Sequence, residues 1–167
     1  MSIPAVSIPK VEVFPGRLRL FVSMADDAPR FTDEALMNRA FAEYPTLGMH
    51  SCINSKGPTF GDVAVGTSIP HLLEHLIIAE QVIDANSKGT AADDPSIASA
   101  RINEGNGDSR GHAKEATFVG TTKWDDGGAE AGHAVVEVSF IDDLQALAAL
   151  KRALSFLNRA LYEGDAF

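Results

Sequence analysis

The chain contains a single cysteine, Cys52, and few basic residues. One cysteine excludes an internal disulfide framework and is typical of a reducing compartment such as the cytoplasm. Against 14 lysines and arginines stand 23 acidic residues, which gives a formal net charge of −9. Because an acidic surface repels phosphate backbones, we expect no nucleic-acid partner.

Long hydrophobic runs are also missing. There is no run of about 18 apolar residues and no signal-peptide pattern at the N-terminus. We therefore expect a cytoplasmic protein without a membrane segment. The length of 167 residues, with 45% hydrophobic and 22% charged residues, is typical of one globular domain over residues 1–167. This composition is compatible with a homo-oligomer.

The most informative feature that is present is the segment His71-Leu72-Leu73-Glu74-His75, which reads H-x-x-E-H. This is the inverted form of a zinc-binding helix signature. Residues four apart on an α-helix share a face, so His71 and His75 can offer imidazole nitrogens to one cation. Glu74 lies close enough to act on a water at that cation. The pattern predicts Zn²⁺ or another divalent metal, with Glu74 as the catalytic base.

The residues around the motif predict a buried helix. Ser68 is suited to an N-cap and Pro70 to a first helical turn. An apolar stripe continues to about Ala85, and further apolar residues widen it almost all the way round. Buried His and Glu side chains need polar partners, which a cation would supply. The alternative is that both histidines are hydrogen-bonded core residues and that Glu74 lies at the surface.

A catalytic metal usually has three protein ligands, and the motif supplies two of them. Glu137 is the first candidate for the third ligand, because it is a carboxylate in the middle of an apolar strand. Alternation places it on the strand face opposite to its valine neighbours, however, so it needs a bulge to reach a helix packed there. Glu115, His50 and Cys52 are the other candidates. Lys123 is a candidate for binding a substrate carboxylate.

Hydrophobic periodicity predicts an α+β fold in one domain, with a mixed β-sheet and helices packed mainly on one face. Strands are expected at residues 10–14, 17–24, 47–53, 115–124 and 133–141, a short strand or irregular segment at 60–65, and helices at 32–44, 69–85 and 142–163. Residues 86–113 are rich in Gly, Ser, Asn and Asp and lack a period. We expect a long mobile loop or insertion there, with a short helix at 97–102.

An ordered series of segments runs from Phe31 onward. It comprises a helix up to Leu47, the H-x-C segment at 50–52, a glycine-bearing loop at 57–61, a Gly-Thr step into the H-x-x-E-H helix, a Val-Val strand with Glu137, an acidic turn and an alanine-rich helix. In this order the segments resemble the N-terminal domain of cyanophycin synthetase, over about two thirds of the chain. The ordered series is more specific than any single segment.

The resemblance implies a metal-dependent hydrolase that trims polymer into primers. The ATP-using and ligase domains of the synthetase are not expected, so the resemblance implies a stand-alone hydrolase-like domain. We therefore predict hydrolysis of a peptide or isopeptide bond, with a water activated by the metal as the nucleophile. The resemblance implies a cyanophycin-like substrate, and the acidic surface favours an arginine-rich peptide.

Two other functions compete with hydrolysis. One is a non-catalytic module that kept the fold and binds a polymer or a protein. The other is a metal-dependent lyase. S-ribosylhomocysteine lyase has a comparable size and motif helix, but its cysteine ligand lies downstream of the helix, whereas Cys52 lies upstream.

Overall fold

Four strands form one antiparallel sheet in the computed structural model, which describes residues 3–88 and 117–162. The strands are β1 (Val6–Phe14), β2 (Arg17–Met24), β3 (Gly120–Trp124) and β4 (His133–Ser139). Their order is β1-β2-β4-β3, and every pairing between them is antiparallel. The α+β class is confirmed, but the sheet is not mixed. Short connections join β1 to β2 and β3 to β4, and such connections produce antiparallel neighbours.

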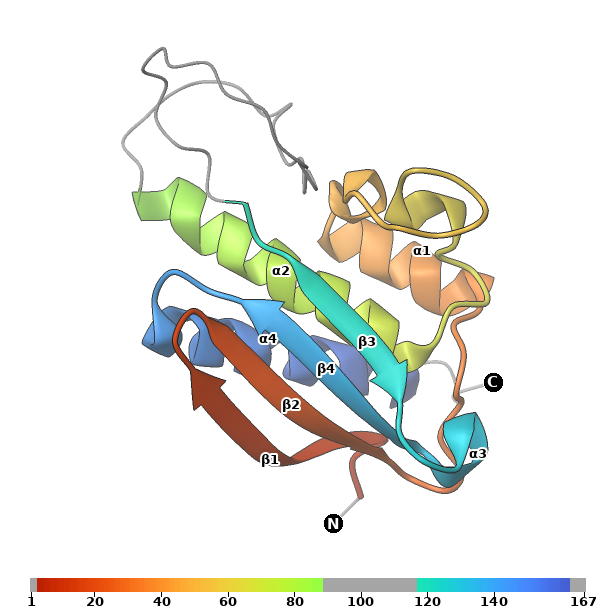
Figure 1. Ribbon diagram of the computed structural model, residues 1–167. Helices are drawn as coiled ribbons and strands as arrows, with labels where there is room; N and C mark the ends of the chain where they lie inside the picture. Colours follow the sequence, from red (N-terminus) through yellow and green to blue (C-terminus); the bar gives the residue numbers. More distant parts are fainter. Residues whose placement is uncertain (1–2, 89–116, 163–167) are drawn as a thin grey trace.

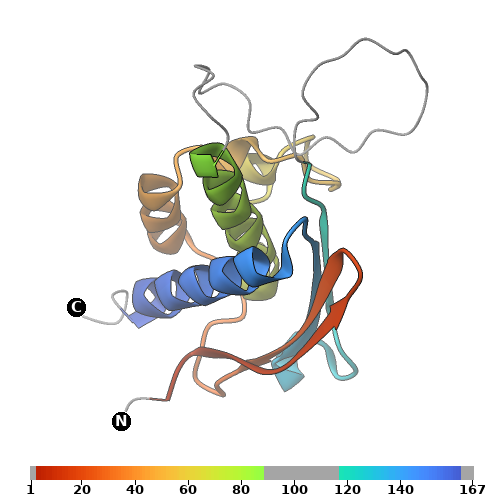
Figure 2. The ribbon, with the colours of Figure 1, turned by 90° about the vertical axis from the view of Figure 1, so that its left-hand side faces the viewer.

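The long helices lie on one face of this sheet, as predicted (Figures 1 and 2). The helices are α1 (Glu34–Glu43), α2 (Ile69–Lys88), α4 (Asp143–Tyr162) and the single turn α3 (Gly128–Ala131), which lies at the end of the sheet between β3 and β4. The long helices α2 and α4 pack against each other, and α2 also contacts β3 and β4. The sheet and this helical layer enclose the hydrophobic core.

Alternation along β2 and β4 decides which side chains enter the core. Leu20 pairs with Val136, and both are fully buried beneath the helices. The next pair, Arg19 and Glu137, lies on the outer face of the sheet. Because successive residues of a strand point to opposite faces, Glu137 cannot turn inward while its valine neighbours stay in the core.

Helix α2 is buried over most of its length, as its nearly uniform apolar surface predicts. It begins after Ser68, whose side-chain oxygen accepts a hydrogen bond of 3.3 Å from the backbone N–H of His71. The predicted N-cap is therefore confirmed. The helix ends at Lys88, three residues later than expected. Among the described residues, no helix is both long and apolar enough to cross a membrane.

The expected strand at 47–53 is wrong, and of the two alternatives for 60–65 the structure shows the irregular segment rather than a short strand. These segments form two 3₁₀ turns, η1 (Leu47–Met49) and η2 (Phe60–Asp62), joined by an isolated bridge between Ser51 and Thr59. The two turns approach each other at glycines, because a Cβ added to Gly61 would lie 2.9 Å from the carbonyl oxygen of Gly48. This close backbone contact favours packed turns over extended strands.

The remaining strand and helix predictions differ from the structure mainly at their ends. Asp33 caps α1, accepting a 2.7 Å hydrogen bond from the N–H of Leu36, so this helix begins at Glu34 rather than at the expected residue 32. The Thr32 hydroxyl donates to the carbonyl of Ala64 at 2.5 Å. Strand β3 begins at Gly120 rather than at residue 115. The short helix expected at 97–102, and the loop expected at 86–113 from residue 89 onward, lie outside the described residues.

Candidate metal centre

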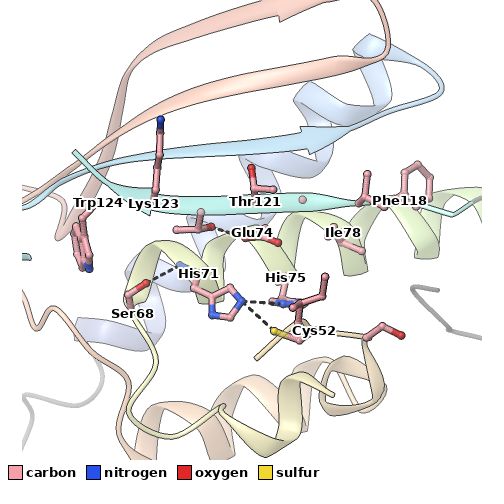
Figure 3. A pocket seen from close by; sticks show the side chains of 15 residues that line it. Cys52, Ser68, His71, Glu74, His75, Ile78, Phe118, Thr121, Lys123 and Trp124 are labelled. Carbon is pink, nitrogen blue, oxygen red and sulfur yellow. Dashed lines mark hydrogen bonds between the residues drawn. The ribbon is translucent and has the colours of Figure 1, made fainter. Parts of the chain in front are cut away.

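The H-x-x-E-H turns of α2 face the loop between η1 and η2, which carries Cys52 (Figure 3). Backbone hydrogen bonds fix this loop: Phe60 N–H donates to His50 O at 2.8 Å, and Cys52 N–H donates to Pro58 O at 3.1 Å. As a result the Cys52 sulfur points toward His71 rather than into solvent.

Three side chains bring metal-ligating atoms together. Cys52 Sγ lies 3.4 Å from His71 Nε2, which lies 3.2 Å from His75 Nε2. All three atoms fall within 4.8 Å of one another. In a tetrahedral zinc site, bonds of about 2.3 Å to sulfur and 2.0–2.1 Å to nitrogen separate neighbouring ligand atoms by about 3.3–3.6 Å. The cluster therefore fits a metal ion, and Cys52 is the candidate third ligand that the fold brings to the histidine pair.

The fully buried ring of Phe60 orients both imidazoles. Its centroid lies 4.2 Å from that of His75 with the planes 31° apart, and 5.4 Å from that of His71 with the planes 87° apart. The first is a tilted contact and the second an edge-to-face contact, an arrangement that aromatic rings favour. The imidazoles are thus held in place by packing before any ligand binds.

Burial also sets the protonation of the ligands. It lowers the pKa of His75 to about 2, with a further contribution from the nearby His71 and His50. It lowers the pKa of His71 as well. Both rings are therefore neutral at physiological pH and have lone pairs to donate. Burial raises the pKa of the Cys52 thiol, and the charge of Glu74 adds to this, so a metal must displace the thiol proton.

Glu74 is 5% exposed and lies between α2 and β3. Burial raises its pKa to about 7, although a 2.5 Å hydrogen bond donated by the Thr122 hydroxyl opposes the shift. Gly120 makes room for the carboxylate, since a Cβ there would lie 2.6 Å from Glu74 Cγ. A carboxyl group that titrates near neutrality can both take up and release a proton at working pH.

A cavity of about 400 Å³ opens onto Cys52, His71, Glu74 and His75. Its walls combine apolar and hydroxyl-bearing side chains, including Ile53, Ile78, Phe118, Thr122 and Trp124. The volume falls in the range of small-molecule sites. The donor cluster and Glu74 therefore share one cavity.

Glu137, the first candidate for the third ligand, does not belong to this site. Its carboxylate receives a 2.7 Å hydrogen bond from Arg19 Nε and lies 3.3 Å from Arg17 Nη1, on the outer face of the sheet. The hydrogen bond from Arg19 is the main reason that the pKa of Glu137 is lowered. The prediction is wrong because strand alternation outweighs the apolar sequence context.

Lys123 borders the cavity, but its exposed side chain points away from α2 (Figure 3). It shares the outer face with Glu137, whose pKa its positive charge helps to lower. Its predicted role in binding a substrate carboxylate stays a prediction. Glu115, another candidate ligand, lies outside the described residues.

Sequence reasoning missed Thr122, Thr67 and Phe60. Thr122 holds Glu74, and Thr67 Oγ1 lies 2.7 Å from His71 Nδ1. Alternation along β3 places Thr122 on the side that faces the helices, and this pattern could have identified it from the sequence. Comparison of the chain with protein-family models, curated proteins and solved structures gave no match.

Proposed function

We propose that the protein is a metal-dependent hydrolase that cleaves a peptide or isopeptide bond. One observation carries the proposal: the Cys52, His71 and His75 donors open onto the same cavity as a buried Glu74 whose pKa is near 7. Buried groups with strongly shifted pKa values, gathered in a cavity, are typical of catalytic sites.

Zinc suits the donor set best. A thiolate and two imidazoles favour zinc over magnesium or calcium, which prefer oxygen ligands, although other divalent metals that accept sulfur also fit. Cys52, His71 and His75 would hold the ion, and a site with three protein ligands would leave one position for water or substrate. When bound there, zinc would polarise the carbonyl of the substrate and increase the acidity of a water.

Glu74 has the role of general base and then general acid. It takes a proton from the attacking water while the new C–O bond forms, and it delivers that proton to the leaving nitrogen as the C–N bond breaks. The hydrogen bond from Thr122 keeps the carboxylate in a fixed position. The apolar walls of the cavity hold the substrate and limit access of bulk water.

We propose a cyanophycin-like or arginine-rich peptide as the substrate class. The net charge of −9 supports the arginine-rich peptide, because it attracts cationic chains over distances of about a Debye length, whereas the cyanophycin-like substrate rests on the resemblance. The proposed location is the cytoplasm, where a reducing environment keeps Cys52 available as a thiolate ligand.

A metal-dependent lyase is the second candidate. The observation that favours it is the donor set of one cysteine and two histidines, the ligand types of S-ribosylhomocysteine lyase. A carboxyl group with a pKa near 7 also suits abstraction of a proton next to a carbonyl. The two activities differ in their products, because hydrolysis releases an amine and elimination leaves a double bond.

The test is cleavage by zinc-loaded protein. We expect release of primary amine from an isopeptide polymer of aspartate and arginine or from an arginine-rich peptide. Glu74→Gln should lower kcat by roughly 10²–10⁴-fold while zinc content stays at about one per chain. Glu137→Gln is the matched control, with activity within about twofold of the unaltered protein. Absence of amine release by zinc-loaded protein would rule out the hydrolase.

A further inference from the structure

His50 is completely enclosed behind the metal centre, and the proposed function leaves it without a role. It is 1% exposed and stands at the end of η1. Its Nδ1 lies 3.3 Å from Nδ1 of His75. Its Nε2 is buried and, among the described residues, has no hydrogen-bond partner. Packing alone does not account for a histidine here, because an apolar ring would fill the space without an unpartnered nitrogen.

The two ligand histidines are arranged in the same way. Each directs Nε2 toward the donor cluster, and each places Nδ1 against a polar atom outside it. For His71 that atom is Thr67 Oγ1, at 2.7 Å, and for His75 it is His50 Nδ1. Metal-ligating histidines usually have such an outer hydrogen bond, which fixes the tautomer and the ring orientation.

The protons on the rings of His71, His75 and His50 can be assigned. A metal ligand atom carries no proton, so a neutral His75 that binds through Nε2 must carry its proton on Nδ1. That N–H points at His50 Nδ1, which must then be the acceptor of the hydrogen bond. His50 in turn carries its own proton on Nε2, the atom without a partner. Without a metal, the 3.2 Å contact between the two Nε2 atoms requires a proton on one of them.

We propose that His50 is a positioning residue of the metal centre. Its Nδ1 accepts a hydrogen bond from the Nδ1–H of His75, which keeps the proton of His75 on Nδ1 and leaves Nε2 of His75 unprotonated for the metal. This inference rests on the metal site of the proposed function, and it does not depend on the reaction catalysed. His50 is not a fourth ligand, since its Nδ1 meets His75 on the side of the ring away from Cys52 and His71.

A neutral His50 ring keeps an acceptor nitrogen at Nδ1 while Nε2 carries the proton. The same neutral ring accounts for the unpartnered Nε2–H, which the protein tolerates because the opposite nitrogen is needed by His75.

The first experiment measures zinc affinity by competition with a chromophoric chelator. His50→Phe keeps a buried ring but removes the acceptor, and it should weaken zinc binding by roughly 10–100-fold. His50→Asn restores an acceptor oxygen near the position of Nδ1 and should recover most of this loss. His133→Phe, which removes an exposed histidine of β4, is the matched control and should bind zinc as the unaltered chain does.

Stability of the metal-free protein separates positioning from packing. The His50→Phe variant removes the unpartnered nitrogen, so its metal-free thermal midpoint should equal or exceed that of the unaltered chain, although its zinc affinity is lower. Unchanged zinc affinity in His50→Phe, or an equal loss in His50→Asn, would overturn the proposal.

A second measurement needs no variant. In the ¹⁵N spectrum of the zinc-loaded chain, His75 should carry its proton on Nδ1 and His50 on Nε2. A proton on His50 Nδ1 overturns the inference. If zinc binds but no hydrolysis occurs, the hydrolase proposal is ruled out, and zinc affinity and the ¹⁵N spectrum still test the role of His50. If zinc does not bind, both proposals are ruled out.

Discussion

The two faces of the β-sheet hold carboxylates under opposite conditions. On the outer face Glu137 is bonded to Arg19 at 2.7 Å, and this contact lowers its pKa. On the helix-covered face Glu74 is 5% exposed, its hydrogen-bond partner is a neutral hydroxyl, and its pKa rises to about 7. A carboxylate that is desolvated without a positive partner therefore has a raised pKa and becomes a candidate acid–base group. A carboxylate paired with an arginine has a lowered pKa and stays ionised.

Removing a ligand on the covered face should produce the largest effect. Cys52→Ser replaces the sulfur with a weaker oxygen donor, so we expect zinc affinity to fall by more than the roughly 100-fold that loss of an outer hydrogen bond can cost. Amine release should disappear at sub-micromolar free zinc. Chelator competition and elemental analysis measure the loss. Retention of stoichiometric zinc at that concentration would show that a group other than Cys52 completes the site.

A smaller effect should follow from crowding the Glu74 carboxylate. The added Cβ in Gly120→Ala would lie 2.6 Å from Glu74 Cγ, so the side chain must move. We expect kcat to fall roughly 100-fold, as for an active-site group displaced by about 1 Å, and the free energy of unfolding to fall by about 1–3 kcal/mol.

Urea unfolding and steady-state kinetics measure these two quantities. Thr121→Ala, a change on the outer side of the same strand, is the control, and its kinetics should stay close to those of the unaltered chain. If Gly120→Ala leaves kcat unchanged, the position of Glu74 against β3 does not matter for catalysis.

The smallest effect should come from the outer face. Arg19→Gln removes the main cause of the lowered pKa of Glu137, which should then rise toward its ordinary value. A carboxyl group whose pKa is lower in the folded state stabilises the protein above its unfolded pKa, and this contribution is lost as the pH falls through the folded pKa. The variant should therefore lose less stability on acidification than the unaltered protein.

Carbon-13 titration of Glu137 measures the shift in pKa, and urea unfolding at several pH values measures the stability. Zinc affinity should stay unchanged. A fall in zinc affinity in Arg19→Gln would contradict the separation of the two faces.

Much of the fold follows from local patterns. Alternation predicts β2 and β4, and the apolar surface between Ser68 and Ala85 predicts a buried α2. These elements depend on periodicity within a few residues, which a sequence displays directly. The same locality explains why His71 and His75 were identified, since one turn of helix brings them together.

The third ligand could not be selected in the same way. Cys52 lies 19 residues before His71, and its position depends on the contact between the turns at Gly48 and Gly61, which no local pattern predicts. Glu137 was preferred because an acidic residue between valines is unusual. Its pairing with arginines from another strand explains it without a metal. Contacts between segments that are distant in the sequence therefore determine which residues belong to the site.

The ligands of the candidate centre come from two separate parts of the chain. The nitrogens belong to one turn of α2, whereas the sulfur belongs to the loop between η1 and η2. A bound ion would thus act as a cross-link that closes this loop onto the helix. It follows that amide hydrogens of residues 50–60 should exchange with solvent more slowly once the ion is present, and that the entrance to the cavity becomes rigid in the same step.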